Sequence, residues 1–155
     1  MASPPIMLSE HFSLLEMTRT DVRAYQESNA HPPAEVKAAL AALCTTLLEP
    51  LRAHFGAPVV VHSGYRSRAL NSVIGGAVHS QHIRGEAADF HVIGVDLEKV
   101  FHWIWQDSGL QFGQTILEGW AAGHPTWLHL SLERGNPELD GQVLTFSEGR
   151  YRRLA

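Results

Sequence analysis

The sequence predicts a single α+β domain with a central, mainly antiparallel β-sheet and flanking helices. Its 155 residues are about the length of one ordinary domain, and 45% hydrophobic with 18% charged residues is a globular composition. Helical patterns dominate the first part of the chain, whereas strand-like runs dominate the second part with few helices between them. This order favours an α+β fold over a repeat of βαβ units.

The first half of the chain predicts an irregular arm at 1–12, a short helical turn at 14–18 and a polar stretch at 20–33. A longer helix follows, because apolar residues recur at spacings of 4, 3, 4 and 4 on one helical face. Pro50 should kink or interrupt its last turn, and Gly56 should end it. The residues of this face are Val36, Leu40, Leu43, Leu47 and Leu51.

The second half predicts strands with turns and two further helices. A short buried strand is expected at 58–62, a turn at 63–67 and a short helix at 68–74 that ends at two glycines. The remaining elements are strands at 87–92, 112–118, 127–132 and 143–146, an amphipathic helix at 96–107, and a basic end at 150–153 that we expect to be a solvated tail.

Charge and cysteine content exclude several classes of protein. The formal net charge of −4 argues against binding to nucleic acid or to anionic membranes, and the single Cys44 excludes an internal disulfide and cysteine-rich zinc sites. The start of the chain lacks the pattern of a signal peptide, and no apolar run is long enough to span a membrane. We therefore expect a protein that is made in the cytoplasm. Ten histidines direct attention to metal or acid–base chemistry.

Two histidines and one aspartate form the most informative pattern. His82 ends a loop, Gly85 allows a turn, and Asp89 follows on the next predicted strand. On the strand at 127–132, alternation places Trp127, His129 and Ser131 on one face and leucines on the other. Two imidazoles and a carboxylate are a ligand set typical of catalytic zinc, which keeps its fourth position open.

The pattern Ser-x-His-x-x-Gly-x-Ala-x-Asp at 80–89, followed by Trp-x-His at 127–129, resembles the zinc D-Ala-D-Ala carboxypeptidase family, which shares its fold with the hedgehog signalling domain. The turn Ser63-Gly-Tyr-Arg-Ser67 resembles the family's turn with a substrate-binding arginine. Segments 8–13 and 114–118 are most similar to a small phage and prophage branch. The resemblance covers about 8–132, which would make this the core of a domain over 1–155, with a strand and basic tail at 133–155.

The resemblance implies a role for each matching residue. His82, Asp89 and His129 would be the ligands of one Zn²⁺ per chain. Arg66 and Ser80 would touch a carboxylate or the backbone of the substrate. We also expect Tyr65, from the same turn as Arg66, and Trp127 to bind the substrate.

Position 126 departs from the family pattern. Members of the dipeptidase type carry a catalytic glutamate three residues before the last histidine ligand, whereas this chain has Thr126, which cannot act as a base. Glu118 would approach the site if the strands at 112–118 and 127–132 pair antiparallel. We expect Glu118 to be the general base, with His124 in the connecting loop as the second candidate.

These features together predict a monomeric zinc metallopeptidase that hydrolyses amide bonds in peptidoglycan stem or cross-bridge peptides, as a carboxypeptidase or an endolysin-like endopeptidase. Phage-type machinery or cell lysis would deliver it to the cell wall. The alternative is a zinc-containing binding or virion-structural domain of the same fold without turnover, which the absence of a glutamate at position 126 favours.

Overall fold

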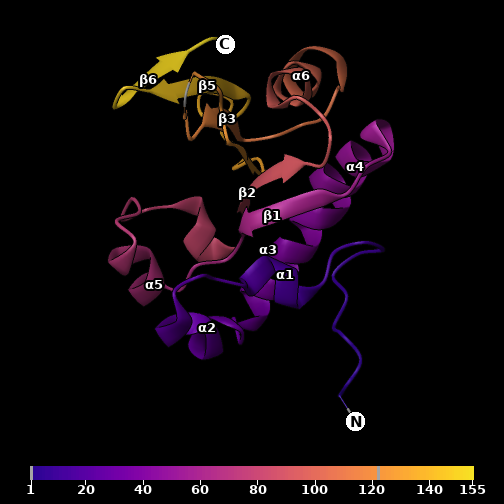
Figure 1. The fold of residues 1–155 in the computed structure, drawn as a ribbon, viewed down its shortest axis with the longest axis vertical. Helices are drawn as coiled ribbons and strands as arrows, with labels where there is room; N and C mark the ends of the chain where they lie inside the picture. The colour runs from indigo at the N-terminus through magenta and orange to yellow at the C-terminus, as the bar shows by residue number, and fades with distance from the viewer. Residues whose placement is uncertain (1, 122) are drawn as a thin grey trace.

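In the computed structural model, which describes residues 2–121 and 123–155, six β-strands form one sheet in the order β1-β2-β4-β3-β5-β6 (Figure 1). Neighbouring strands are antiparallel except for β3 and β5, which run parallel. The strands are β1 (Val59–Ser63), β2 (Ala87–Val92), β3 (Gln114–Glu118), β4 (Trp127–Ser131), β5 (Gln142–Ser147) and β6 (Arg150–Arg153). This single α+β domain with a mainly antiparallel sheet confirms the predicted fold class.

The helices precede β1 or connect the strands. They are α1 (Leu14–Thr18), α2 (Arg23–Asn29), α3 (Ala34–Leu43), α4 (Glu49–Phe55), α5 (Arg68–Val73) and α6 (Leu97–His102). A 3₁₀ turn, η2 (Gln81–Arg84), leads into β2, and a π-helical segment, η3 (Trp103–Asp107), continues α6. Among the described residues, no helix is long and apolar enough to cross a membrane.

The predicted long helix runs through α3, a π-helical segment η1 (Cys44–Leu48) and α4. The predicted apolar face is buried along its whole length. The helix is not interrupted at Pro50. Instead, the residue before it bonds across five residues, as in a π-helix: the Glu49 N–H donates to the Cys44 carbonyl. Proline has no N–H to donate, so the turn before it adjusts locally. Gly56 ends α4 with a positive φ of 60°, as predicted.

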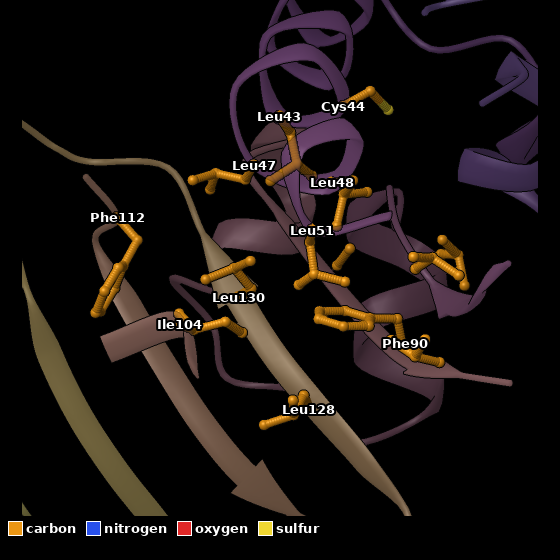
Figure 2. Packing of buried hydrophobic residues seen from close by; sticks show 14 of the residues in the cluster. Leu43, Cys44, Leu47, Leu48, Leu51, Phe90, Ile104, Phe112, Leu128 and Leu130 are labelled. Atoms are coloured by element: carbon orange, nitrogen blue, oxygen red, sulfur yellow. The ribbon is translucent and has the colours of Figure 1, made fainter. Parts of the chain in front are cut away.

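The core lies between this helix and one face of the sheet. Figure 2 shows Leu47, Leu48 and Leu51 of the helix directed toward Phe90 of β2 and Leu130 of β4. Because side chains alternate along a strand, residues next to these core positions point to the opposite face. Asp89 and His129 are such neighbours. The packing of the core therefore fixes which face of the sheet carries the polar side chains.

Two segments differ from the prediction. The polar stretch at 20–33 contains α2, in which Asn29 is the buried residue, so no apolar period marks this helix. Asn29 holds it in place, since its amide donates to the carbonyls of Thr18 (2.6 Å) and Tyr65 (3.0 Å). The basic end is not a solvated tail: β6 pairs with β5 through its backbone while its side chains remain exposed.

Candidate metal centre

His82 is held in one orientation by contacts on both sides. It lies in η2 and its ring is almost fully buried; its backbone N–H donates to the hydroxyl of Ser80, which caps this turn. Its Nδ1 lies 2.7 Å from the Gly64 carbonyl oxygen. A carbonyl only accepts, so Nδ1 carries the proton and Nε2 is left with its lone pair. That Nε2 lies 3.3 Å from Asp89 Oδ1.

Asp89 and His129 lie directly opposite each other on the paired strands β2 and β4. The same Oδ1 of Asp89 is 3.0 Å from Nδ1 of His129, and the two imidazole rings have centroids 5.2 Å apart. Antiparallel register therefore brings together two residues that are 40 positions apart in the sequence. The three side chains offer ligand atoms that all lie within 4.8 Å of one another.

This group fits a metal ion. The Nε2 atoms of both histidines are buried and lack a hydrogen-bond partner among the described residues. Buried polar atoms are costly without partners, so an unpaired lone pair in each of two adjacent imidazoles calls for a ligand. Two nitrogens and one carboxylate oxygen match the donor set of catalytic zinc, with a position left for water or substrate.

Arg66 supplies a positive charge beside the group. Its Nη2 lies 3.5 Å from Asp89 Oδ2, and its remaining donors reach Ser63 Oγ (3.1 Å) and Asn71 Oδ1 (3.2 Å). Burial lowers the pKa of Arg66, although Asp89 and Glu118 act in the opposite direction. Burial alone would raise the pKa of Asp89, but the positive charge that His82 and His129 carry when protonated, together with their hydrogen bonds, holds it well below its ordinary value. Asp89 is thus ionised, as a metal ligand requires.

Glu118 ends β3 and faces the same space. It is half-buried and lies opposite Trp127 in the register of β3 and β4. A cavity of about 390 Å³ is lined by Glu118 together with His82, Asp89, His129, Arg66 and Ser80. Burial, followed by the charge of Asp89, raises the pKa of Glu118. The antiparallel pairing that brings Glu118 toward the predicted ligands is therefore present.

The sequence profile of the Peptidase M15 family matches residues 10–129. The chain belongs to the Peptidase M15 family. This confirms the resemblance to zinc D-Ala-D-Ala carboxypeptidases, while its phage branch stays a prediction. Peptidases of the M15 family are zinc-dependent, which agrees with the candidate ligands His82, Asp89 and His129. A search of the curated proteins finds no match.

Three other residues singled out from the sequence do not line this cavity of the M15 domain. Tyr65 is half-buried beside Arg66, and its backbone N–H donates to the Met17 carbonyl at 2.7 Å. Trp127 is half-buried next to Glu118 in register. His124 is exposed and lines a different hollow, together with His62 and His91. Thr126 donates its hydroxyl to the Gly119 carbonyl and so closes the β3–β4 loop.

The cavity lining also includes polar residues that the sequence analysis did not identify, among them Gln81, Gln114, Arg134 and Tyr151. Gln81 lies inside the motif at 80–89, next to His82, and this position is what could have indicated from the sequence that it lines the cavity. Arg134 and Tyr151 both follow the family match. Arg134 lies in the loop after β4, and Tyr151 reaches the cavity because β5 pairs with β3 and β6 with β5.

Proposed function

We propose that this M15 protein is a zinc peptidase that hydrolyses amide bonds in peptidoglycan stem or cross-bridge peptides. The observation that carries the proposal is the convergence of two imidazole nitrogens without partners among the described residues, an ionised aspartate and a second carboxylate, that of Glu118, in one cavity. Membership of the M15 family supports peptidoglycan peptides as the substrate class. All these groups come from one chain, so we also propose that the monomer with one zinc is the active species.

His82, Asp89 and His129 would hold the zinc. Zinc in such a site polarises the carbonyl of a scissile amide and makes water a stronger acid. The Gly64 carbonyl orients the ring of His82, as second-sphere partners of metal-binding histidines commonly do. This contact keeps Nε2 as the atom that is free to bind.

Glu118 would act as the general base. Its carboxylate takes a proton from the attacking water and then gives a proton to the leaving amine. Burial and Asp89 raise its pKa toward the working range of such a group, while the charge of zinc acts in the opposite direction. His124 lies in another hollow, which favours Glu118 over His124 for this role.

Arg66 and Ser80 would position the peptide. The guanidinium of Arg66 is held by Ser63 and Asn71, so it is oriented before substrate binds and can pair with a substrate carboxylate. The hydroxyl of Ser80 accepts from the His82 N–H and can donate its own proton to a substrate carbonyl. Tyr65 and Trp127 flank these groups from outside the cavity lining, and we propose a supporting role for them.

Digestion of purified peptidoglycan tests this proposal. The zinc-loaded protein should release peptides or amino acids, a chelator should stop the release, and added zinc should restore it. Mass analysis of the products separates the removal of a terminal residue from the cutting of a stem or cross-bridge. If the zinc-loaded protein binds peptidoglycan but releases nothing, the non-catalytic binding domain is the correct interpretation.

A further inference from the structure

We propose that the segment that follows the family match builds a second carboxylate-binding subsite on the metal cavity, with Arg134 as its cation. The inference rests on the proposed peptidase function and specifies its substrate: an acidic peptide that carries a free carboxylate near the scissile amide, in addition to the one that Arg66 would hold. Three features of the described residues support it.

Arg134 is an exposed arginine whose backbone, but not whose side chain, is anchored. It follows β4, and its backbone is anchored by Asp140, whose carboxylate accepts from the N–H groups of Arg134 (2.7 Å) and Asn136 (2.9 Å). In the described part of the chain, its guanidinium forms no ion pair and no hydrogen bond. It lines the metal cavity and also a small adjoining hollow. Arg66, by contrast, is already shared with Asp89.

Gln81 is an unpartnered amide in the same place. It is only 5% exposed, it lines both hollows, and no hydrogen bond of its side chain occurs among the described residues. The amide therefore keeps donor and acceptor capacity that a ligand in these hollows can use. Its neighbour Gln114 donates to Gln142 at 3.1 Å and so is held on the wall that the two hollows share.

Tyr151 completes the wall from β6. It lies opposite Phe146 in the β5–β6 register, and the two rings have centroids 4.5 Å apart, which orients the phenol. The lining of the cavity thus includes a guanidinium, an amide N–H and a phenol O–H. This set supplies several donors and one positive charge, a combination suited to a carboxylate.

Peptidoglycan in native and amidated form provides the test. Carbodiimide and ammonia convert its carboxylates to carboxamides. On native peptidoglycan, Arg134→Ala should lower kcat/KM about tenfold or more, the scale of one lost charge-assisted hydrogen bond. On amidated peptidoglycan, it should change kcat/KM less than twofold. Arg134→Lys should recover part of the loss, because it keeps the charge. Equal activity of Arg134→Ala and wild type on the native substrate, or equal losses on both substrates, would overturn the subsite.

Arg152→Ala is the matched control, because Arg152 is an exposed arginine of β6 that does not line the cavity. It should leave both substrates unaffected, and zinc content should be the same in all these variants. If wild type cleaves neither substrate, the peptidase proposal fails. In that case, and also if wild type cleaves only the native substrate because Arg66 loses its carboxylate as well, the subsite is tested by calorimetry with soluble native and amidated stem peptides. Binding of the native peptides that is about tenfold weaker in Arg134→Ala supports the subsite, and equal binding overturns it.

Discussion

Asp89 and Glu118 are two carboxylates of one cavity whose surroundings shift their pKa values in opposite directions. Burial raises the pKa of both carboxyl groups. The imidazoles of His82 and His129 stabilise the ionised form of Asp89, however, so the pKa of Asp89 falls. The pKa of Glu118 rises, because burial and the negative charge of Asp89 outweigh the groups that stabilise its ionised form. Such divergence is typical of paired groups with distinct roles, here the proposed metal ligand and the proposed base.

Glu118→Gln should retain zinc and the fold but lose about 10²-fold or more in rate, because the amide keeps the size of the side chain and cannot accept a proton. The measurement is peptide release from peptidoglycan together with zinc content. Glu27→Gln, which changes an exposed glutamate on α2, is the control and should be as active as wild type. Near-normal turnover by Glu118→Gln would remove Glu118 from the role of base.

At the level of residues, the sequence predicted the parts of the site that have a motif. The spacing of His82 and Asp89 and the alternation around His129 placed all three candidate ligands, which the fold brings together. Arg134 and Tyr151 have no such signal. Tyr151 approaches the cavity through the pairing of β5 with β3 and of β6 with β5, and Arg134 through the loop that Asp140 holds after β4; local sequence specifies neither arrangement.

Gly85 joins η2 to β2 and thereby sets the distance between two candidate ligands. It has a positive φ of 72°, and an added Cβ would lie 2.8 Å from the Val36 carbonyl oxygen. Gly94 has a similar φ of 74° but open space around it. The two glycines therefore separate the cost of a left-handed backbone from the cost of a close contact.

Gly94→Ala should lower the free energy of unfolding by about 1 kcal/mol, the cost of a left-handed alanine. Gly85→Ala should cost at least about 1 kcal/mol more and should weaken zinc binding, because α3 and η2 must move apart. Urea unfolding and zinc titration of both variants measure this. Equal destabilisation by the two substitutions would show that the contact with α3 does not matter.

Glu49 of α4 fastens the N-terminal arm. Its carboxylate accepts from Ser9 Oγ (3.0 Å) and from the His11 N–H (2.8 Å), and its second oxygen lies 2.8 Å from His11 Nδ1. Burial would raise the pKa of Glu49, but these contacts lower it below its ordinary value of 4.5. The group of Glu10, His11 and Glu49, which also has metal-ligand composition, is accounted for by this anchoring role.

Glu49→Gln should lower the free energy of unfolding by about 1 kcal/mol at pH 7, since charged hydrogen bonds are replaced by neutral ones. A depressed pKa contributes stability above the unfolded-state value and loses it as pH falls through the folded-state value. The difference between variant and wild type should therefore shrink as the pH drops below about 4.5. Urea unfolding across pH measures it; Glu10→Gln, at an exposed position, is the control. A difference that does not change with pH would contradict this account.

At the level of elements, the sequence predicted those helices and strands that have a periodic pattern of apolar residues. The face from Val36 to Leu51 and the strand at 87–92 are present. Helix α2 and strand β6 were not predicted as such, because α2 is held by polar contacts of Asn29 and β6 by backbone pairing with exposed side chains. Neither kind of contact leaves an apolar pattern in the sequence.

At the level of the whole molecule, the two faces of the sheet have different roles. One face packs on the helices, as Figure 2 shows, and the other presents Asp89 and His129 from neighbouring strands. The terminal hairpin β5–β6 extends this second face at the edge opposite β1 (Figure 1). Metal binding should therefore stabilise the assembled sheet and not a local loop.

Zinc at 100 times its Kd should stabilise the fold by about 2.7 kcal/mol, which for a chain of this length raises Tm by roughly 5–10 °C. His82→Ala should abolish this increase, because it removes a ligand that is almost fully buried. His102→Ala, at an exposed position of α6, should keep it. Thermal unfolding with and without zinc provides the data. An equal increase in Tm for wild type and His82→Ala would place the zinc elsewhere.

The zinc content of the purified chain tests the metal centre most directly. Protein prepared without metal, loaded with zinc and freed of excess should contain close to one zinc per chain by elemental analysis, and Asp89→Ala and His129→Ala prepared alongside should contain almost none. A wild-type chain that takes up no zinc, or a His129→Ala variant that binds as much as wild type, would contradict the assignment of His82, Asp89 and His129 as the metal ligands.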